Sequence, residues 1–167
     1  MTQESVSAGE RPQARRAIRA AEYRAAFAGD PHVFLVGDLR KPAAHPYWRD
    51  PRVELVLCRY EAGQDGEPHW HADVTEYELV LEGRIGYLHV ASGETLWFEP
   101  GDLSAVPAGS CVKRSVPVAS RTLAVKVPSR PGDKVLCHAC ARRCDHRIAP
   151  ESRPRSSRAG DAPGADA

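Results

Sequence analysis

The chain has 167 residues and a formal net charge of +1, with 23 lysines and arginines against 22 aspartates and glutamates. This length supports one well-buried core rather than two, so we expect a single domain with one principal site. The near balance of charge excludes a global field that would recruit nucleic acid, and we do not expect nucleic-acid binding. Neither a signal-peptide segment nor a membrane-spanning window is present, so we expect a cytoplasmic protein that does not bind membranes.

Composition divides the chain into four segments. Residues 1–13 and 151–167 are rich in Pro, Ser, Gly, Ala and charged residues, and we expect both to be disordered. Residues 14–130 are expected to form one β-rich domain that begins with a short helix. Residues 131–150 are expected to form a separate extension that is rich in cysteine and histidine.

The helix is predicted within residues 13–27, where alanine and arginine predominate. Ile18, Ala21 and Ala25 are spaced to share one helical face. The Gly-Asp pair that precedes Pro31 is a stop signal, so the helix is expected to end there.

From Val33 onward the sequence changes to short β-rich runs separated by Gly, Pro, Asp and Ser turn signals. Their regular spacing is typical of an antiparallel sandwich or barrel. No helical period interrupts them, as parallel βαβ units would require, so the predicted fold class is all-β. The strands are expected in residues 32–38, 52–60, 77–83, 84–90, 95–101, 103–109 and 121–128.

The stretch EPHWHADVTEYELVLEG, residues 67–83, combines two histidines and two glutamates at the start of a strand. Alternate side chains of a strand share a face, so His69 and His71 are predicted to point together into a barrel. Antiparallel pairing is expected to bring Glu76, which begins the next strand, back toward them. Two imidazoles and one carboxylate favour iron, manganese, nickel, copper or zinc over magnesium or calcium, and they leave coordination positions open.

This stretch resembles the first cupin motif, GxxxxxHxHxxxxExxxxxxG. Its fixed positions are occupied by Gly63, His69, His71, Glu76 and Gly83. The segment GDLSAVPAG resembles the start of the second cupin motif, with Gly101, Pro107 and Gly109 in register. The resemblance covers roughly residues 52–128 and is to the small single-domain cupins. It implies a jelly-roll β-barrel that holds one divalent metal on the two matching histidines and the matching glutamate.

The second motif departs from the family pattern, because the position of its histidine, the fourth metal ligand, falls on Val112. Strand alternation directs both neighbours of Val112 away from that face, whereas Arg114 shares it. Glu78 lies two residues after Glu76 and is therefore expected to face inward too. An inward carboxylate needs a partner.

Two interpretations of this site follow. In the first, the metal is retained, Glu78 is a candidate general base, and Arg114 either pairs with Glu78 or binds an anionic substrate. In the second, the metal has been lost and the two residues form an internal ion pair in a remodelled ligand pocket. We favour the first, because a binder without metal has little reason to keep both histidines and Glu76 in register.

The segment CHACARRCDH forms a second cluster of potential ligands. Cys137, Cys140, Cys144 and His146 supply the four ligands that a tetrahedral zinc site needs, although the spacing matches no common zinc finger. The alternatives are a redox-active CxxC pair or three unrelated thiols. We favour zinc, because bunched cysteines in a reducing compartment more often bind metal.

Two functions are consistent with these features. The favoured one is a small metal-dependent enzyme, dioxygenase-like or isomerase-like, that acts on a small polar molecule. The alternative is a non-catalytic cupin module that binds or senses a small ligand or a metal, and the fold alone does not decide between them. We also expect a homodimer. The aromatic segment HPYWRD, residues 45–50, is compatible with a lid or a dimer contact, and a packed loop is the simpler interpretation.

Overall fold

The computed structural model describes residues 17–40 and 43–137, and within these ranges the chain forms one helix and ten strands. They are α1 Ala20–Gly29, β1 His32–Val36, β2 Glu54–Tyr60, β3 His69–His71, β4 Thr75–Glu82, β5 Ile85–His89, β6 Glu94–Phe98, β7 Leu103–Val106, β8 Val112–Ser115, β9 Ser120–Val127 and β10 Lys134–Leu136.

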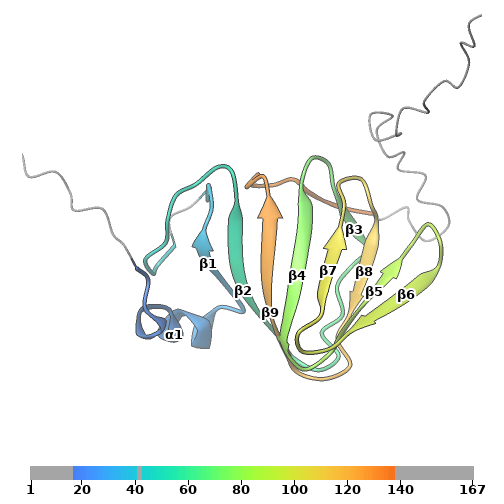
Figure 1. Cartoon of the computed structure of the whole chain (residues 1–167), viewed down its shortest axis with the longest axis horizontal. Helices are drawn as coiled ribbons and strands as arrows, with labels where there is room; N and C mark the ends of the chain where they lie inside the picture. The colour runs from blue at the N-terminus through green and yellow to red at the C-terminus, as the bar shows by residue number, and fades with distance from the viewer. Residues whose placement is uncertain (1–16, 41–42, 138–167) are drawn as a thin grey trace, which may run out of the picture.

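The strands form two five-stranded antiparallel sheets, ordered β1-β2-β9-β4-β7 and β10-β3-β8-β5-β6. Figure 1 shows the first sheet running across the molecule from β1, beside α1, with the strands of the second sheet behind and beyond β7. This arrangement is a jelly roll and confirms the predicted all-β fold class. In the described part of the chain, no helix has the length and apolar character needed to cross a membrane.

Helix α1 begins later than the alanine and arginine content predicts. The part expected before residue 17 lies outside the described residues. Arg19 is extended, and its backbone N–H donates to a Glu22 carboxylate oxygen at 2.6 Å, which caps the first turn. The end of the helix is where it was predicted, since Asp30 is again extended and precedes Pro31, whose ring disfavours helical geometry before it.

Each of the seven predicted strand ranges overlaps an observed strand, and the motif residues had indicated strands at β3 and β8, but β10 was not predicted. It pairs with β3, with Lys134 opposite His71 and Leu136 opposite His69. The sheet therefore continues beyond residue 130, where we expected the barrel domain to end. Three residues after a Pro-Gly turn are too few to show the alternation by which strands are recognised.

The barrel interior has an apolar part and a charged part. Burial alternates along β2, and the apolar part of the core comprises Val56, Cys58, Tyr60, Val80, Ile85, Tyr87, Val106, Val112, Val116 and Ala124. Across β2, β9 and β4, the register aligns Glu54, Lys126 and Glu76 in one inward row. The charged side chains are thus gathered toward one end of the barrel.

The outer face of the first sheet has an apolar part as well, beside a charged row of Arg59, Arg121 and Glu82. Two apolar rows cross four of its five strands, β2, β9, β4 and β7. The first row consists of Leu55, Val125, Tyr77 and Ala105, and the second of Leu57, Leu123, Leu79 and Leu103. Leu103 is 62% exposed. An antiparallel sheet usually presents a polar outer face to water, so this face is unusual.

The HPYWRD segment packs as a loop along β1. The backbone N–H of Trp48 donates to the carbonyl of Leu35 at 2.9 Å, and the N–H of Gly37 donates to the carbonyl of Trp48 at 2.9 Å. These two hydrogen bonds hold the loop against the strand, in agreement with the simpler interpretation of this segment.

Candidate metal centre

Three side chains converge inside the barrel, and they are the three that the first motif predicts. His69, His71 and Glu76 each place a ligand atom so that all three atoms lie within 4.8 Å of one another. The route by which they meet differs from our prediction. Strands β3 and β4 do not pair but belong to different sheets, so Glu76 faces the histidines across the barrel interior.

In His69, Nε2 is the ring nitrogen that can bind a metal. Its Nδ1 lies 3.0 Å from the backbone carbonyl of Glu67, an acceptor, so Nδ1 carries the proton and Nε2 keeps its lone pair. Burial lowers the pKa of His69 to about 4, although the Glu67 carbonyl opposes the shift. The imidazole is therefore neutral at neutral pH, as a metal ligand must be.

His71 lies between two carboxylates. Its Nε2 is 3.2 Å from Oε2 of Glu76, and its Nδ1 is 3.4 Å from Oδ2 of Asp133. The second contact is not aligned as a hydrogen bond, so buried Nδ1 has no hydrogen-bond partner. Asp133 is itself held by the backbone N–H groups of Asp73 and Val74. A carboxylate behind a histidine in this way is the usual device that orients a metal-binding imidazole.

Glu76 is ionised and has a cation as its neighbour. Burial by itself raises the pKa of Glu76, but the contact with His71 and the charge of Lys126 lower it to about 2. Lys126 lies directly opposite Glu76 in β9 and also pairs with Glu54, Nζ to Oε1, at 3.2 Å. Burial opposes the charge of Lys126 too, yet the two carboxylates raise its pKa overall. The sequence reading missed Lys126, although alternation along β9 could have placed it inside.

The donor set fits a divalent transition metal. Two imidazoles and one carboxylate are the nitrogen and oxygen ligands that such ions take. Val112 lies opposite His69 in the β3–β8 pairing, so the two side chains share a face, and Val112 is only 2% exposed. Its apolar side chain offers no ligand, so the described residues supply three donors rather than the four of the full cupin pattern.

Glu78 lies deeper and accepts hydrogen bonds from three hydroxyls. Its Oε1 accepts from Tyr60, at 3.3 Å, and from Thr122, while its Oε2 accepts from Tyr87. Arg114 Nη1 donates to the Tyr60 hydroxyl at 2.9 Å, and its guanidinium lies 3.8 Å from the centre of the Tyr60 ring. Arg114 and Glu78 are thus connected through Tyr60 rather than by the direct ion pair that we considered.

The environment of Glu78 differs from that of the metal ligands. It is 1% exposed, and burial followed by the charge of Glu76 raises its pKa, against the hydrogen bonds from Thr122 and Tyr87. Glu78 does not belong to the group of three converging ligands. Because both of its oxygens already accept hydrogen bonds, the geometry favours Glu78 as a residue that positions the tyrosines.

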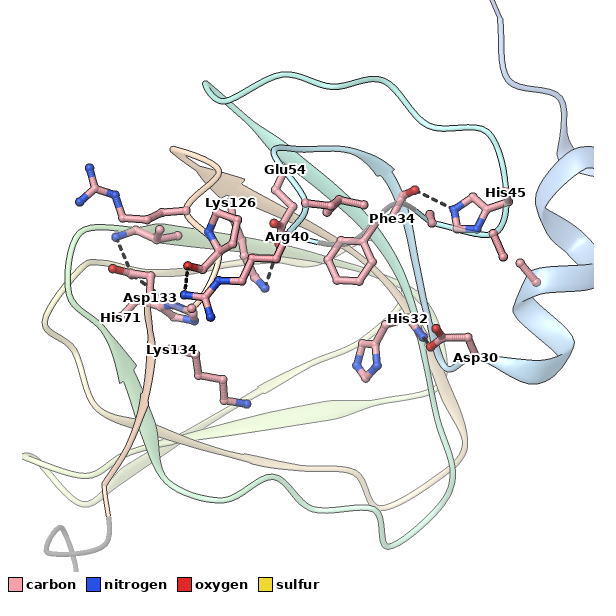
Figure 2. Close-up of a pocket in the computed structure, with 18 of the residues that line it drawn as sticks. Asp30, His32, Phe34, Arg40, His45, Glu54, His71, Lys126, Asp133 and Lys134 are labelled. Carbon is pink, nitrogen blue, oxygen red and sulfur yellow. Dashed lines mark hydrogen bonds and ion pairs between the residues drawn. The ribbon is translucent and has the colours of Figure 1, made fainter.

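A cavity of about 710 Å³ reaches the candidate metal centre at His71. Its walls come from α1, β1, loops, and single residues of β2, β3, β9 and β10. Figure 2 shows His71, Asp133 and Lys134 at one end of this cavity and His45 at the other. Four cationic side chains line it, namely Arg40, Lys126, Arg130 and Lys134. A small molecule therefore has room beside the candidate centre.

The Cys/His cluster is described only at its first residue. Cys137 is disulfide-bonded, and its backbone N–H donates to the carbonyl of Pro68 at 2.9 Å. Cys140, Cys144 and His146 lie outside the described residues. Zinc binds thiolates, so a zinc site that includes Cys137 requires this disulfide to be reduced. The zinc site of the Cys/His cluster remains a prediction.

The sequence reading also missed Asp133 and Lys134. Both lie in or beside β10, which we assigned to the extension, and their role depends on pairing with a strand about 60 residues earlier. No local pattern in the sequence indicates this pairing.

Comparison with known proteins gives matches of structure alone. No family model matches the sequence, and no curated protein matches it. The structure of the DMSP lyase DddQ from Ruegeria pomeroyi is similar with a TM-score of 0.52 and 17% identity, over 63% of this chain and 50% of that one. An RmlC-like cupin from Shewanella frigidimarina gives a TM-score of 0.45 and 20% identity, over 49% and 71%. The Clostridium difficile EutQ protein gives 0.42 and 22%, over 48% and 60%.

These comparisons concern the fold. The chain spans 50% of the length of DddQ and 60% of that of EutQ. The likeness to DddQ shows a shared fold, and the identities are too low to carry over an activity. The ten described strands lie in two antiparallel sheets, and β3 and β4 carry the two histidines and the glutamate of the first cupin motif. The chain therefore has the jelly-roll fold of the cupin superfamily.

Proposed function

We propose that this protein is a small metal-dependent enzyme that acts on a small polar molecule, with His69, His71 and Glu76 as its metal ligands. The observation that supports the proposal is the convergence of these three ligand atoms within 4.8 Å beside an open cavity. A divalent metal supplies Lewis acidity there or, if redox-active, activates oxygen. The reaction type is thus dioxygenase-like or isomerase-like.

The residues around the ligands have separate tasks in this proposal. Asp133 orients His71, and the apolar side chain of Val112 leaves a coordination position to water or substrate. Glu78 accepts a hydrogen bond from the Tyr60 hydroxyl, and Arg114 donates a hydrogen bond to the same hydroxyl. We propose Arg114 as the residue of this group that binds substrate. The general-base role that we considered for Glu78 is less well supported than a positioning role.

One observation favours the alternative, a non-catalytic module that binds a small ligand without metal. Glu76 contacts His71 and lies opposite Lys126, which pairs with Glu54, so the Glu76 carboxylate has a cation beside it without a metal ion. Elemental analysis of protein purified without added metal separates the two functions. About one equivalent of iron, manganese, nickel, copper or zinc supports the enzyme, and redox-active metal favours oxygen chemistry. Protein that takes up none of these metals when they are supplied contradicts it.

Restoring the missing histidine tests whether Val112 borders the metal. We expect Val112→His to raise metal affinity at least about tenfold, because a fourth donor then shares a face with His69. Competition with a chromogenic chelator measures the affinity, and Val112→Leu controls for the change in side-chain volume. Turnover is expected to fall, since the new imidazole occupies the open position. Equal affinity in the His and Leu variants would mean that residue 112 does not border the metal.

We also propose that the protein is a homodimer that pairs through the outer face of the first sheet. Neither apolar row contains a charged residue, so a two-fold axis can place this face against itself without like-charge repulsion. Two sheets packed in this way bury apolar surface on both copies.

The dimer proposal predicts a change of mass. Leu103→Glu is expected to convert a dimer to a monomer, because it places two carboxylates in the apolar interface. The control is Leu96→Glu, which alters a comparably apolar residue, 41% exposed, in the other sheet. Size-exclusion chromatography with light scattering measures both. A monomeric wild type, or a Leu103→Glu variant that stays dimeric, contradicts the proposed interface.

A further inference from the structure

We infer that the substrate of the proposed metal centre is a small organic carboxylate, and that Lys134 is the residue that binds its anionic group. This inference rests on the proposed function and deepens it. Lys134 lies on β10, directly opposite His71 of β3. Residues directly opposite in an antiparallel pair point to the same face of the sheet, so Lys134 shares the face of His71, and its solvent-exposed side chain lines the cavity. Figure 2 shows its side chain extended into the cavity between His71 and His32.

Lys134 differs from the other three cations of the cavity because, in the described part of the chain, its ammonium has neither a carboxylate nor a carbonyl partner. Lys126 pairs with Glu54 at 3.2 Å, and Arg130 pairs with Asp73. Arg40 donates to the Pro131 carbonyl at 2.9 Å. Within residues 17–40 and 43–137, the Lys134 ammonium makes no ion pair. It thus remains available to an anion that enters the cavity.

The net charge around the candidate metal centre also favours an anionic substrate. With a divalent ion bound, the formal charges of the ion, Glu76, Asp133, Glu54 and Lys126 sum to zero. The ammonium of Lys134 is then an excess positive charge at the same end of the cavity. Burial and then the charge of Arg114 lower the pKa of Lys134, against the charges of Glu76 and Glu67.

The surroundings favour a carboxylate over a phosphate. Phosphate sites usually combine several guanidinium or backbone N–H donors. Here one ammonium has no ion pair within the described residues, and Phe34, Leu39 and Val74 add apolar surface to the cavity wall. A carboxylate on a small carbon skeleton matches both the one cation and the apolar walls.

The test measures carboxylate binding to protein loaded with Mn²⁺, with acetate, succinate and citrate as probes and succinamide as the uncharged probe. Titration calorimetry gives affinities for wild type, Lys134→Met and Lys134→Arg. The matched control is Lys113→Met, the same change on strand β8 of the same sheet. Metal content is measured in every sample. We expect at least one carboxylate to bind wild type more tightly than succinamide does, and Lys134→Met to weaken that binding about tenfold or more. Lys134→Arg and Lys113→Met should retain it.

Two results overturn the inference. One is equal carboxylate affinity in wild type and Lys134→Met at equal metal content. The other is a wild type that binds none of the three carboxylates more tightly than succinamide. Absence of metal uptake by wild type is a different result and overturns the proposed function. In that case, carboxylate affinities of metal-free wild type and metal-free Lys134→Met are compared. Weaker binding by the variant supports the role of Lys134, and equal binding overturns it.

Discussion

Replacing His69 and His71 together by alanine is expected to remove about one equivalent of metal from the protein and to leave the barrel folded. The double variant keeps only Glu76 of the three converging ligands, and one carboxylate does not hold a transition metal tightly. The fold should survive because the jelly roll has its own apolar core, to which the two histidines do not belong. Metal content by mass spectrometry and the circular dichroism of the same sample measure the two effects.

The matched control is His45→Ala. The imidazole of His45 hydrogen-bonds the carbonyl of Phe34 at 2.8 Å and lies at the far end of the cavity from His71, as Figure 2 shows. We expect this variant to keep its metal. If the double variant is folded and still carries a full equivalent of metal, the metal binds elsewhere. If the double variant unfolds, the metal content of Glu76→Gln is measured instead, because this change removes a ligand charge and keeps both imidazoles.

Glu78→Ala is expected to lower the free energy of unfolding by about 3–5 kcal/mol. The change leaves a cavity where a fully buried side chain stood. It also removes the acceptor of three buried hydroxyls, those of Tyr60, Tyr87 and Thr122. Urea unfolding followed by tryptophan fluorescence measures the loss, and an unchanged slope with urea indicates that the two-state comparison holds.

Glu82→Ala is the control for Glu78→Ala because it removes a carboxylate from the same strand. Glu82 is exposed and pairs with Arg121 at 2.8 Å, and such surface pairs contribute about 1 kcal/mol or less. We expect the two variants to differ by several-fold in their effect on stability. A loss of under about 1 kcal/mol for Glu78→Ala would show that the three hydroxyls find other partners.

The sequence predicts the local parts of the metal centre well. Alternation along a strand is a property of adjacent residues, so the shared face of His69 and His71 follows from spacing alone. The same rule accounts for Val112 and Arg114 in β8, and it could have found Lys126. The resemblance to cupins adds Glu76, whose position depends on an approach between two sheets that spacing does not describe.

The remaining parts of the site depend on contacts between distant segments. Asp133 and Lys134 act through the pairing of β10 with β3, and Pro131 and Gly132 obscure the strand in the sequence. The link between Glu78 and Arg114 was misjudged for a related reason. Both were placed on inward faces, but a sequence does not show that the Tyr60 hydroxyl lies between them.

The position of β3 between β8 and β10 determines when the metal centre can form as the chain folds. The backbone N–H of Asp73 bonds to Asp133, 60 residues later in the chain, and the two neighbours of β3 are both later in sequence. Closing loops of this length is slow compared with forming helices or hairpins. On a ribosome, His69 and His71 would emerge well before the strands that hold them in place. Metal is therefore expected to enter a nearly finished barrel, and the ion would add to native-state stability more than to the rate of folding.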